Sequence, residues 1–176
     1  MPLHVKPGTA WSDWHARARA AAPEAFDAQS LRNLMGGEWV AGGATRPHAL
    51  AVDGSQIVGA PVVDSATAHK AMAMAVKQDF EWSRVPLEER MRRVAKAVAL
   101  LREQRDTIAG LLMWEIGKPW KLACDDVDRC LDGVDWYLTQ IERQLDDRVP
   151  LDGPVSNIAS WNYPLSVLVH AELVQL

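Results

Sequence analysis

Apolar residues recur every three or four positions from Asp64 onward, and this period predicts amphipathic helices over residues 64–145. Asp64 or Ser65 is placed to cap the first helix, and Pro86 is placed to open the second. The apolar face of the first comprises Ala68, Met72, Ala75, Val76 and Phe80, and that of the second Leu87, Met91, Val94, Val98 and Leu101. Two successive helices are therefore predicted between residues 64 and 101.

The clearest helix is predicted after Pro119, where apolar residues step by four and three positions. Its stripe comprises Trp120, Cys124, Val127, Leu131, Val134, Leu138 and Ile141. A stripe of this length needs a partner surface that buries it. A shorter helix is expected just before it, capped by Asp106 and ended by Gly117.

The chain ahead of these helices has shorter patterns. Residues from Trp11 to about Leu34 are rich in Ala and Arg, which indicates one or two surface helices broken near Pro23. Glu38-Trp39-Val40 and Gln56–Val62 each follow a glycine-containing turn and are predicted to be strands. Together these two strands are expected to form a small antiparallel ribbon.

The last 30 residues predict a strand, a turn and a helix in succession. A polar connector follows Gln144, Val155–Ala159 is expected to be a buried strand, and an apolar helix is expected from Pro164 to Leu176. The turn between them carries Asn162 between two aromatic residues. Strand-to-helix turns of α/β proteins are where ligands bind, so this turn is the leading candidate site.

Composition narrows the class of protein. The chain has 176 residues, of which 48% are hydrophobic and 24% charged, as in ordinary globular proteins. A net charge of −4, without a Lys/Arg stripe, argues against a nucleic-acid partner. No apolar run approaches the roughly 18 residues of a membrane span, and the first residues lack the apolar core of a signal peptide. We therefore expect a cytoplasmic protein with no membrane partner.

Other candidate reactive groups have ordinary explanations. Cys124 and Cys130 lie six residues apart on the predicted helix, so a disulfide is not expected, and Cys124 fits an inert core thiol better than a nucleophile. The scattered histidines have no metal-ligand spacing, so no metal site is predicted. His170, in the last apolar helix, fits a packed core residue. Aspartates at 125, 126, 128, 132 and 135 fit a solvated helix face better than a metal or acid–base site.

Asn162 has two interpretations from the residues alone. Its side chain can satisfy backbone groups at the turn, or it can be a neutral donor aimed at an oxygen that gains negative charge during acyl chemistry. Taken alone, the first interpretation is favoured.

Four motifs together resemble the aldehyde dehydrogenase superfamily. Ser160-Trp161-Asn162-Tyr163-Pro164 is similar to its Pro-Trp-Asn-Phe-Pro signature, and Gly37-Glu38-Trp39-Val40 is similar to its opening strand. Phe80-Glu81-Trp82 with residues 86–90, and Glu115-Ile116-Gly117-Lys118-Pro119, resemble two further family segments in the same order. The resemblance runs from Gly36 to the last residue and does not explain the first 35.

The resemblance implies NAD(P)-dependent oxidation of a small-molecule aldehyde to an acid or acyl thioester through a cysteine thiohemiacetal. In that scheme Asn162 matches the side-chain donor to the oxyanion. Ile158, Ala159, Ser160 and Trp161 match the segment along the NAD or NADP cofactor, and Tyr163 matches an aromatic wall of the substrate tunnel. The family's catalytic cysteine and glutamate base match nothing in these 176 residues, so this chain alone is expected to be inactive.

The fold implied is α/β: the N-terminal part of an aldehyde dehydrogenase-like, Rossmann-like fold, mostly helical here. Its segments are an N-terminal helical extension (1–35), a β ribbon (36–63), a helical layer of the NAD(P)-binding domain (64–145), and a connector with the first strand and helix of an incomplete nucleotide-binding parallel sheet (146–176). Whether the protein is a homo-oligomer is left open, since the connector is short for the segment in which this family has an oligomerisation strand. The alternative function is a non-catalytic scaffold or assembly module with the same fold.

Overall fold

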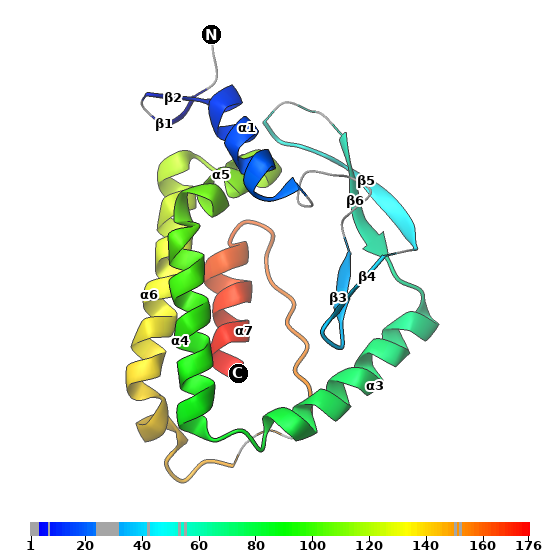
Figure 1. Cartoon of the computed structure of the whole chain (residues 1–176), viewed down its shortest axis with the longest axis vertical. Coiled ribbons are helices and arrows are strands. Elements are labelled where there is room, and N and C mark those ends of the chain that lie inside the picture. Colours follow the sequence, from blue (N-terminus) through cyan, green and yellow to red (C-terminus); the bar gives the residue numbers. More distant parts are fainter. Residues whose placement is uncertain are drawn as a thin grey trace.

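The computed structural model describes residues 4–6, 8–23, 32–41, 43–52, 54, 56–149, 151 and 153–176. Its helices are α1 (Trp11–Ala21), α3 (Ser65–Trp82), α4 (Leu87–Glu103), α5 (Arg105–Ile116), α6 (Trp120–Leu145) and α7 (His170–Gln175), the last preceded by a π-helical segment, η1 (Pro164–Val169). Its strands are β1 (His4–Lys6), β2 (Thr9–Ala10), β3 (Asn33–Met35), β4 (Glu38–Val40), β5 (Ala44–Ala49) and β6 (Gln56–Val62). Figure 1 shows α4, α6 and α7 side by side, with α3 and the strands β3 to β6 on the other side of the molecule.

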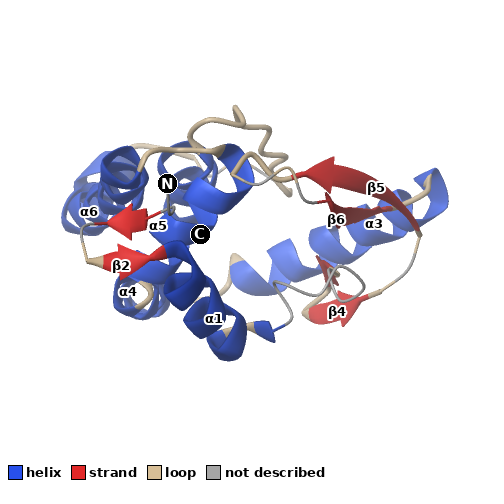
Figure 2. Ribbon diagram, turned by 90° about the horizontal axis from the view of Figure 1, so that it is seen from above, coloured by secondary structure: helices blue, strands red, loops and turns tan. Residues whose placement is uncertain are grey.

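The strands form three separate two-stranded antiparallel ribbons, which Figure 2 shows apart from one another. The predicted strands at 38–40 and 56–62 are confirmed, but their pairing with each other is wrong: β4 pairs with β3, and β6 pairs with β5. The reason is the turn at Gly36 and Gly37, whose φ angles are 60° and 86°. Two positive φ values make the tight reversal typical of a two-residue hairpin, so β4 folds back onto the residues just before it.

The main core lies between α4, α5 and α6. Its buried members are Val94, Val98, Ala109, Leu112, Ala123, Cys124, Val127, Leu131 and Val134. Most of them belong to the apolar stripes predicted for α4 and α6, and Leu138 and Trp120 pack at the edge. The starts expected at Pro86 and Pro119 and the end expected at Gly117 are confirmed. The predicted cap at Asp106 is wrong, because α5 begins at Arg105 and the Asp106 carboxylate instead binds Lys6 and Arg105.

A second, smaller core joins the first residues to the end of α5. Val5, Trp14, Ala18, Leu50 and Trp114 are buried together. The helix expected near Trp11 is therefore partly confirmed as α1, which contributes two of these residues. Leu34, which the sequence pattern placed near the end of this helical region, lies in β3 instead.

Helix α3 differs from the other long helices because none of its residues is buried. Its cap at Asp64 is confirmed: the Thr67 N–H donates to Asp64 Oδ1 at 2.7 Å. Its predicted apolar face is nevertheless uncovered, since Met72, Val76 and Phe80 are 51%, 52% and 53% exposed. No helix within the described ranges is both long and apolar enough to cross a membrane.

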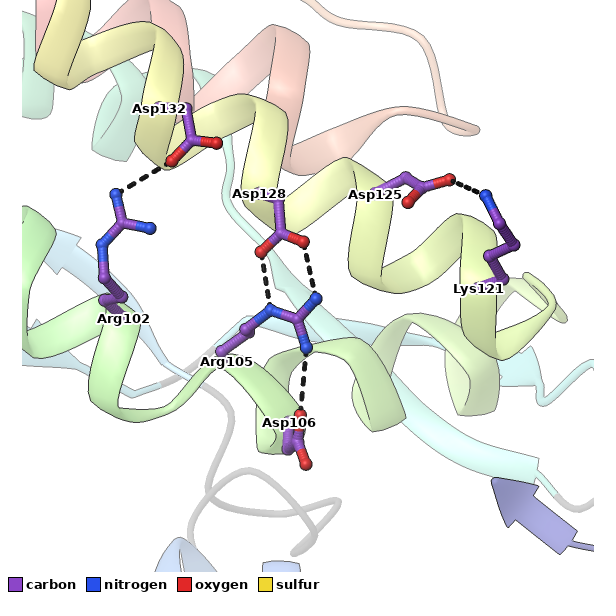
Figure 3. Close-up of polar contacts among 7 residues, drawn as sticks. All are labelled: Arg102, Arg105, Asp106, Lys121, Asp125, Asp128 and Asp132. Carbon is purple, nitrogen blue, oxygen red and sulfur yellow. Dashed lines mark hydrogen bonds and ion pairs between the residues drawn. The ribbon is translucent and has the colours of Figure 1, made fainter. Parts of the chain in front are cut away.

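The acidic side of α6 is held by basic residues, as Figure 3 shows. Arg105 binds Asp128 with two hydrogen bonds of 2.6 and 2.5 Å, and Arg102 reaches Asp132 at 3.1 Å and Asp135 at 2.7 Å. These pairs tie α6 to the junction of α4 and α5. The Arg105 guanidinium lowers the pKa of the Asp128 carboxyl below its usual range through these hydrogen bonds.

The strand predicted at Val155–Ala159 is not formed: residues 154–160 carry no strand in the structure. A strand exists only where a neighbouring strand completes its hydrogen bonds, and no described strand lies beside this segment. The helix predicted from Pro164 is confirmed, but it starts with the wider turn of η1 before becoming α7. The chain is thus mostly helical with small ribbons, and no parallel sheet unit is present among the described residues.

Candidate functional site

The corner between α5 and α6 places one lysine under the turn that carries Asn162. Gly117 ends α5 in the left-handed conformation, with φ of 69°, and Pro119 precedes the first residue of α6. A glycine is favoured at such a helix end because it has no Cβ to strain the positive φ. Lys118, between the two, is directed inward, and its side chain is only 8% exposed.

Lys118 forms a buried ion pair with Asp126 on the second turn of α6. Lys118 Nζ lies 3.1 Å from Asp126 Oδ2, and the Asp126 side chain is fully buried. Two charges removed from water are stable only where further hydrogen bonds satisfy them. The contact between them is not an aligned hydrogen bond, and Asp126 Oδ2 has no hydrogen-bond partner among the described residues. The hydrogen bonds of the pair are made to other groups by Lys118 Nζ and Asp126 Oδ1.

Both charged groups direct those hydrogen bonds at the Asn162 turn, which we define as residues 160–166. Lys118 Nζ donates to the backbone carbonyl of Asn162 at 2.8 Å, and the Ser166 N–H donates to Asp126 Oδ1 at 3.0 Å. The Lys118 ammonium also lies 3.9 Å from the centre of the Tyr163 ring, a distance at which the cation attracts the ring face. The turn is therefore held at its middle and at its end.

The start of η1 explains why a carboxylate is favoured here. Pro164 has no N–H, and the next N–H groups of a helix have no partner within the helix itself. Asp126, from a different helix, accepts from one of them at Ser166. A negative charge at this end of a helix is also favoured by the helix dipole.

The predicted site residues lie on the exposed side of this turn. Asn162 is exposed, and within the described ranges its side chain has no hydrogen bond; only its carbonyl is engaged. Trp161 is 74% exposed and Ile158 95%, Ser160 is exposed, and Ala159 is partly covered. Tyr163 is also exposed, at 36%, although its ring lies against the Lys118 ammonium. The amide of Asn162 therefore faces solvent rather than the packed core.

These residues do not line either of two hollows on the described surface. One hollow, of about 330 Å³, lies between α1, the first strands and Trp120, and the other, of about 520 Å³, lies between the ribbons and the start of α3. Asn162 and the residues just before it thus lie on the surface outside both of these hollows.

Sequence reasoning missed the two buried charges. Lys118 was noticed only as part of a motif, and Asp126 was grouped with a solvated acidic face, which is wrong for this one aspartate. A signal was available: Asp126 shares a face of α6 with small residues at helical spacing, Ala123, Cys130 and Gly133. A Cβ at Gly133 would lie 2.8 Å from His170 Nε2, so this second face is where α7 approaches.

The two cysteines are not candidates for a nucleophile. Both are buried, and burial raises the pKa of each thiol, that of Cys130 to about 11 with a contribution from the Asp126 charge. A thiolate is the reactive form, so these cysteines are unreactive near neutral pH. The inert interpretation of Cys124 agrees with its position in the main core.

Comparison with known proteins shows to which family this chain belongs. The profile of the aldehyde dehydrogenase family matches residues 39–176. This chain belongs to that family. In sequence it is 33% identical over 100 residues to the bifunctional protein PutA of Salmonella typhimurium. The matched residues make up 56% of this chain and 8% of that protein. It is 27% identical over 145 residues to the malonate-semialdehyde dehydrogenase of Bacillus cytotoxicus, covering 78% of this chain and 29% of the relative.

Solved structures share the fold of this chain. The 1-pyrroline-5-carboxylate dehydrogenase of Thermus, solved with bound NAD, matches 99% of this chain with a TM-score of 0.74 at 23% identity. HpcC of Thermus thermophilus matches 95% of it with a TM-score of 0.75 at 19% identity. The match to the first structure therefore extends into the described part of residues 1–35, for which the sequence motifs gave no relationship. The chain spans 37% and 35% of these two structures, or about a third of each.

Proposed function

We propose that the protein containing this chain oxidises an aldehyde to a carboxylic acid or an acyl thioester, with NAD or NADP as the acceptor. The observation that carries this proposal is the Asn162 amide, which faces solvent on a turn held by buried charges in a chain of the aldehyde dehydrogenase family. The named relatives that oxidise aldehydes, and the structure solved with NAD, support the same class of reaction.

The reaction begins with a cysteine thiolate, which attacks the aldehyde carbon and forms a C–S bond while the carbonyl oxygen becomes an oxyanion. The Asn162 side chain donates a hydrogen bond to that oxygen. One such donor accounts for about 10²–10³ in rate, or about 2.7–4 kcal/mol of barrier, in other oxyanion holes. The oxyanion then re-forms the carbonyl as the hydride leaves, and a thioester to the cysteine remains. Water activated by a glutamate, or another thiol, then attacks the thioester carbon, and the C–S bond breaks to release the acid or the new thioester and the cysteine thiolate.

The segment before Asn162 fits a cofactor that supplies the hydride acceptor. Ile158 and Trp161 present apolar side chains that the described residues leave uncovered. In this proposal Ile158, Ala159, Ser160 and Trp161 lie along NAD or NADP, and Tyr163 lies by the aldehyde. The nucleophile and the glutamate come from outside these 176 residues, because Cys124 and Cys130 are buried and unreactive.

The second candidate is a non-catalytic scaffold or assembly module with the same fold. The burial of both cysteines favours it for the 176-residue chain taken by itself. The chain alone should then produce no reduced nicotinamide from any aldehyde, a result expected under either proposal. Only an activity measurement on the protein that contains the chain can distinguish the two proposals.

The coding frame beyond the codon for Leu176 gives that test. A continuing frame whose product reduces NAD or NADP with an aldehyde, and in which Asn162→Ala lowers kcat by about 10²–10³ with cofactor affinity kept, supports the enzyme. An in-frame stop directly after this codon, or an Asn162→Ala product of unchanged kcat, contradicts it. Cofactor binding is followed by tryptophan fluorescence, with Trp161→Phe as the control that assigns the quenching, because the chain has eight tryptophans.

A further inference from the structure

We infer that Lys118 and Asp126 are positioning residues, a buried charge clamp that fixes the backbone of the Asn162 turn and thereby the direction of the Asn162 side chain. The role of Asn162 in chemistry rests on the proposed function. The clamp itself is a property of the described chain and can be tested without cofactor or aldehyde.

The geometry of the clamp joins three parts of the fold that are distant in sequence. Lys118 comes from the corner between α5 and α6, and Asp126 comes from α6. The residues they hold, Asn162 and Ser166, lie 44 and 40 positions later in the chain. Lys118 Nζ, at 2.8 Å from the Asn162 carbonyl, fixes the peptide plane that follows Asn162. Fixing that plane restricts the ψ angle of Asn162, which sets where its side chain points.

The two carboxylate oxygens of Asp126 make different contacts. Oδ1 accepts from the Ser166 N–H at 3.0 Å, and Oδ2 lies 3.1 Å from the lysine that holds Asn162. One carboxylate thus holds the start of η1 and orients the ammonium beneath the turn. Between these two anchored points lie Tyr163, Pro164 and Leu165, and the Tyr163 ring is held by the same ammonium.

The energetics indicate a purpose beyond stability. Burying two charges is costly, and apolar side chains of similar size in place of such a pair are often neutral or stabilising for the fold. A pair kept only for stability would satisfy each partner with the other. Here the aligned hydrogen bonds of both partners go to the turn, and the side chains are 8% and 0% exposed. Charge-assisted hydrogen bonds of this kind specify one backbone arrangement, which apolar contacts do not.

The experiment replaces the clamp with apolar side chains of similar size in the 176-residue chain, using Lys118→Met with Asp126→Leu. The matched control is Arg105→Met with Asp128→Leu, which removes the other ion pair between the α5 region and α6 and does not touch the turn. Selective ¹⁵N labelling of tyrosine and asparagine reports the result, because the Tyr163 N–H lies in the peptide plane of the Asn162 carbonyl. The chain has two tyrosines, Tyr137 and Tyr163, and three asparagines, Asn33, Asn157 and Asn162. Tyr137→Phe assigns the Tyr163 amide, because it leaves one tyrosine signal.

We expect the order parameter of the Tyr163 backbone amide, which shares the peptide plane of the Asn162 carbonyl, to fall from about 0.85 to below about 0.6 in the clamp variant and to stay high in the control. The Asn157 side chain, which exchanges two hydrogen bonds with Gln175, should keep its signals in both, showing that the segment remains docked on α7. In the unmodified chain the Ser166 amide should be protected from hydrogen exchange, whereas amides in the first turn of a helix usually are not.

Three results would overturn the inference. A Tyr163 amide order parameter that stays high in the clamp variant shows that the charges do not fix the turn. A clamp variant that loses its far-ultraviolet circular dichroism shows that the pair serves the fold as a whole. A Ser166 amide that exchanges freely in the unmodified chain removes one of the two anchors. None of these measurements involves the aldehyde reaction, so failure of the clamp and failure of the proposed function are separate results.

Discussion

The two sides of this molecule bury their apolar residues to very different extents. In the helical layer of α4, α5 and α6, Val127 and Leu131 of α6 are fully buried and Val98 of α4 is 2% exposed. On the other side, Phe80 of α3 is 53% exposed and Trp39 of β4 is 64% exposed. The sequence pattern predicts an apolar face on α3, as it does on α4 and α6. The difference shows that periodicity determines a helix, whereas its burial depends on which other elements lie against it.

The comparison assigns most of the stability of the chain to the helical layer. Burial of apolar surface is the dominant favourable contribution to folding, and α3 has almost none of it here. We predict that the isolated chain aggregates or is partly molten. The structural basis is the uncovered apolar side chains of α3, together with those of Val149, Leu151, Ile158 and Trp161.

The largest effect is expected at Leu131, in the middle of the main core. Leu131→Ala should lower the free energy of unfolding by about 2–5 kcal/mol, because it removes buried methyl groups and leaves a cavity. Phe80→Ala, the matched change on α3, should alter it by less than about 0.5 kcal/mol. Urea unfolding followed by circular dichroism measures both. Equal losses of unfolding free energy in the two variants would show that the apolar face of α3 is covered in solution. The two sides of the molecule would then not differ in burial.

An intermediate effect is expected at Gly110, where α5 meets α1. A Cβ there would lie 2.0 Å from Cε2 of Trp14. Alanine favours a helix over glycine by about 1 kcal/mol, yet overpacking costs about 1–3 kcal/mol, so Gly110→Ala should destabilise the chain. In a Trp14→Leu background the same change should be neutral or stabilising. A stabilising effect of Gly110→Ala alone in thermal unfolding would contradict the close packing of the second core.

A smaller effect is expected at the exposed ion pair that ties α5 to α6. Asp128→Asn should cost about 0.2–1 kcal/mol near neutral pH, since both side chains are about one third exposed. Arg105 lowers the folded pKa of Asp128 below its usual 3.8, so the pair stabilises the fold above that pH. The contribution is lost as the pH falls through the lowered pKa. The difference in unfolding free energy between the two proteins should therefore shrink on acidification, and a constant difference would show that the charge is not its cause.

The smallest global effect is expected at the cap of α3. Asp64→Ala removes the hydrogen bond from the Thr67 N–H. Because α3 lies outside the core, the loss should speed hydrogen exchange in its first turn and leave the global unfolding midpoint unchanged. Asp64→Asn, which keeps an accepting oxygen, is the control. A shift of the global midpoint would indicate that α3 folds as one unit with the helical layer.

Several elements follow from local chemistry, and the sequence predicted them for that reason. The starts after Pro86 and Pro119 and the end at Gly117 each depend on the backbone properties of one residue. The cap at Asp64 depends on the side-chain oxygen of one residue. The pairing of β4 with β3 was not predicted from the sequence, because the residue pattern before Gly36 indicated a helical region. With Asn33–Met35 recognised as a strand, the two glycines would have indicated the hairpin.

The sequence by itself determined the family likeness, the helical layer and the turn that carries Asn162, since all of these depend on residues close together in the chain. Only the tertiary structure decided that Asp126 leaves the acidic face and is buried, and that Lys118 holds the Asn162 carbonyl. It also decided that residues 154–160 form no strand and that α3 stays uncovered. The physical reason is that burial and pairing depend on what lies across a contact, and the residues across these contacts are distant in the chain or do not belong to its described part.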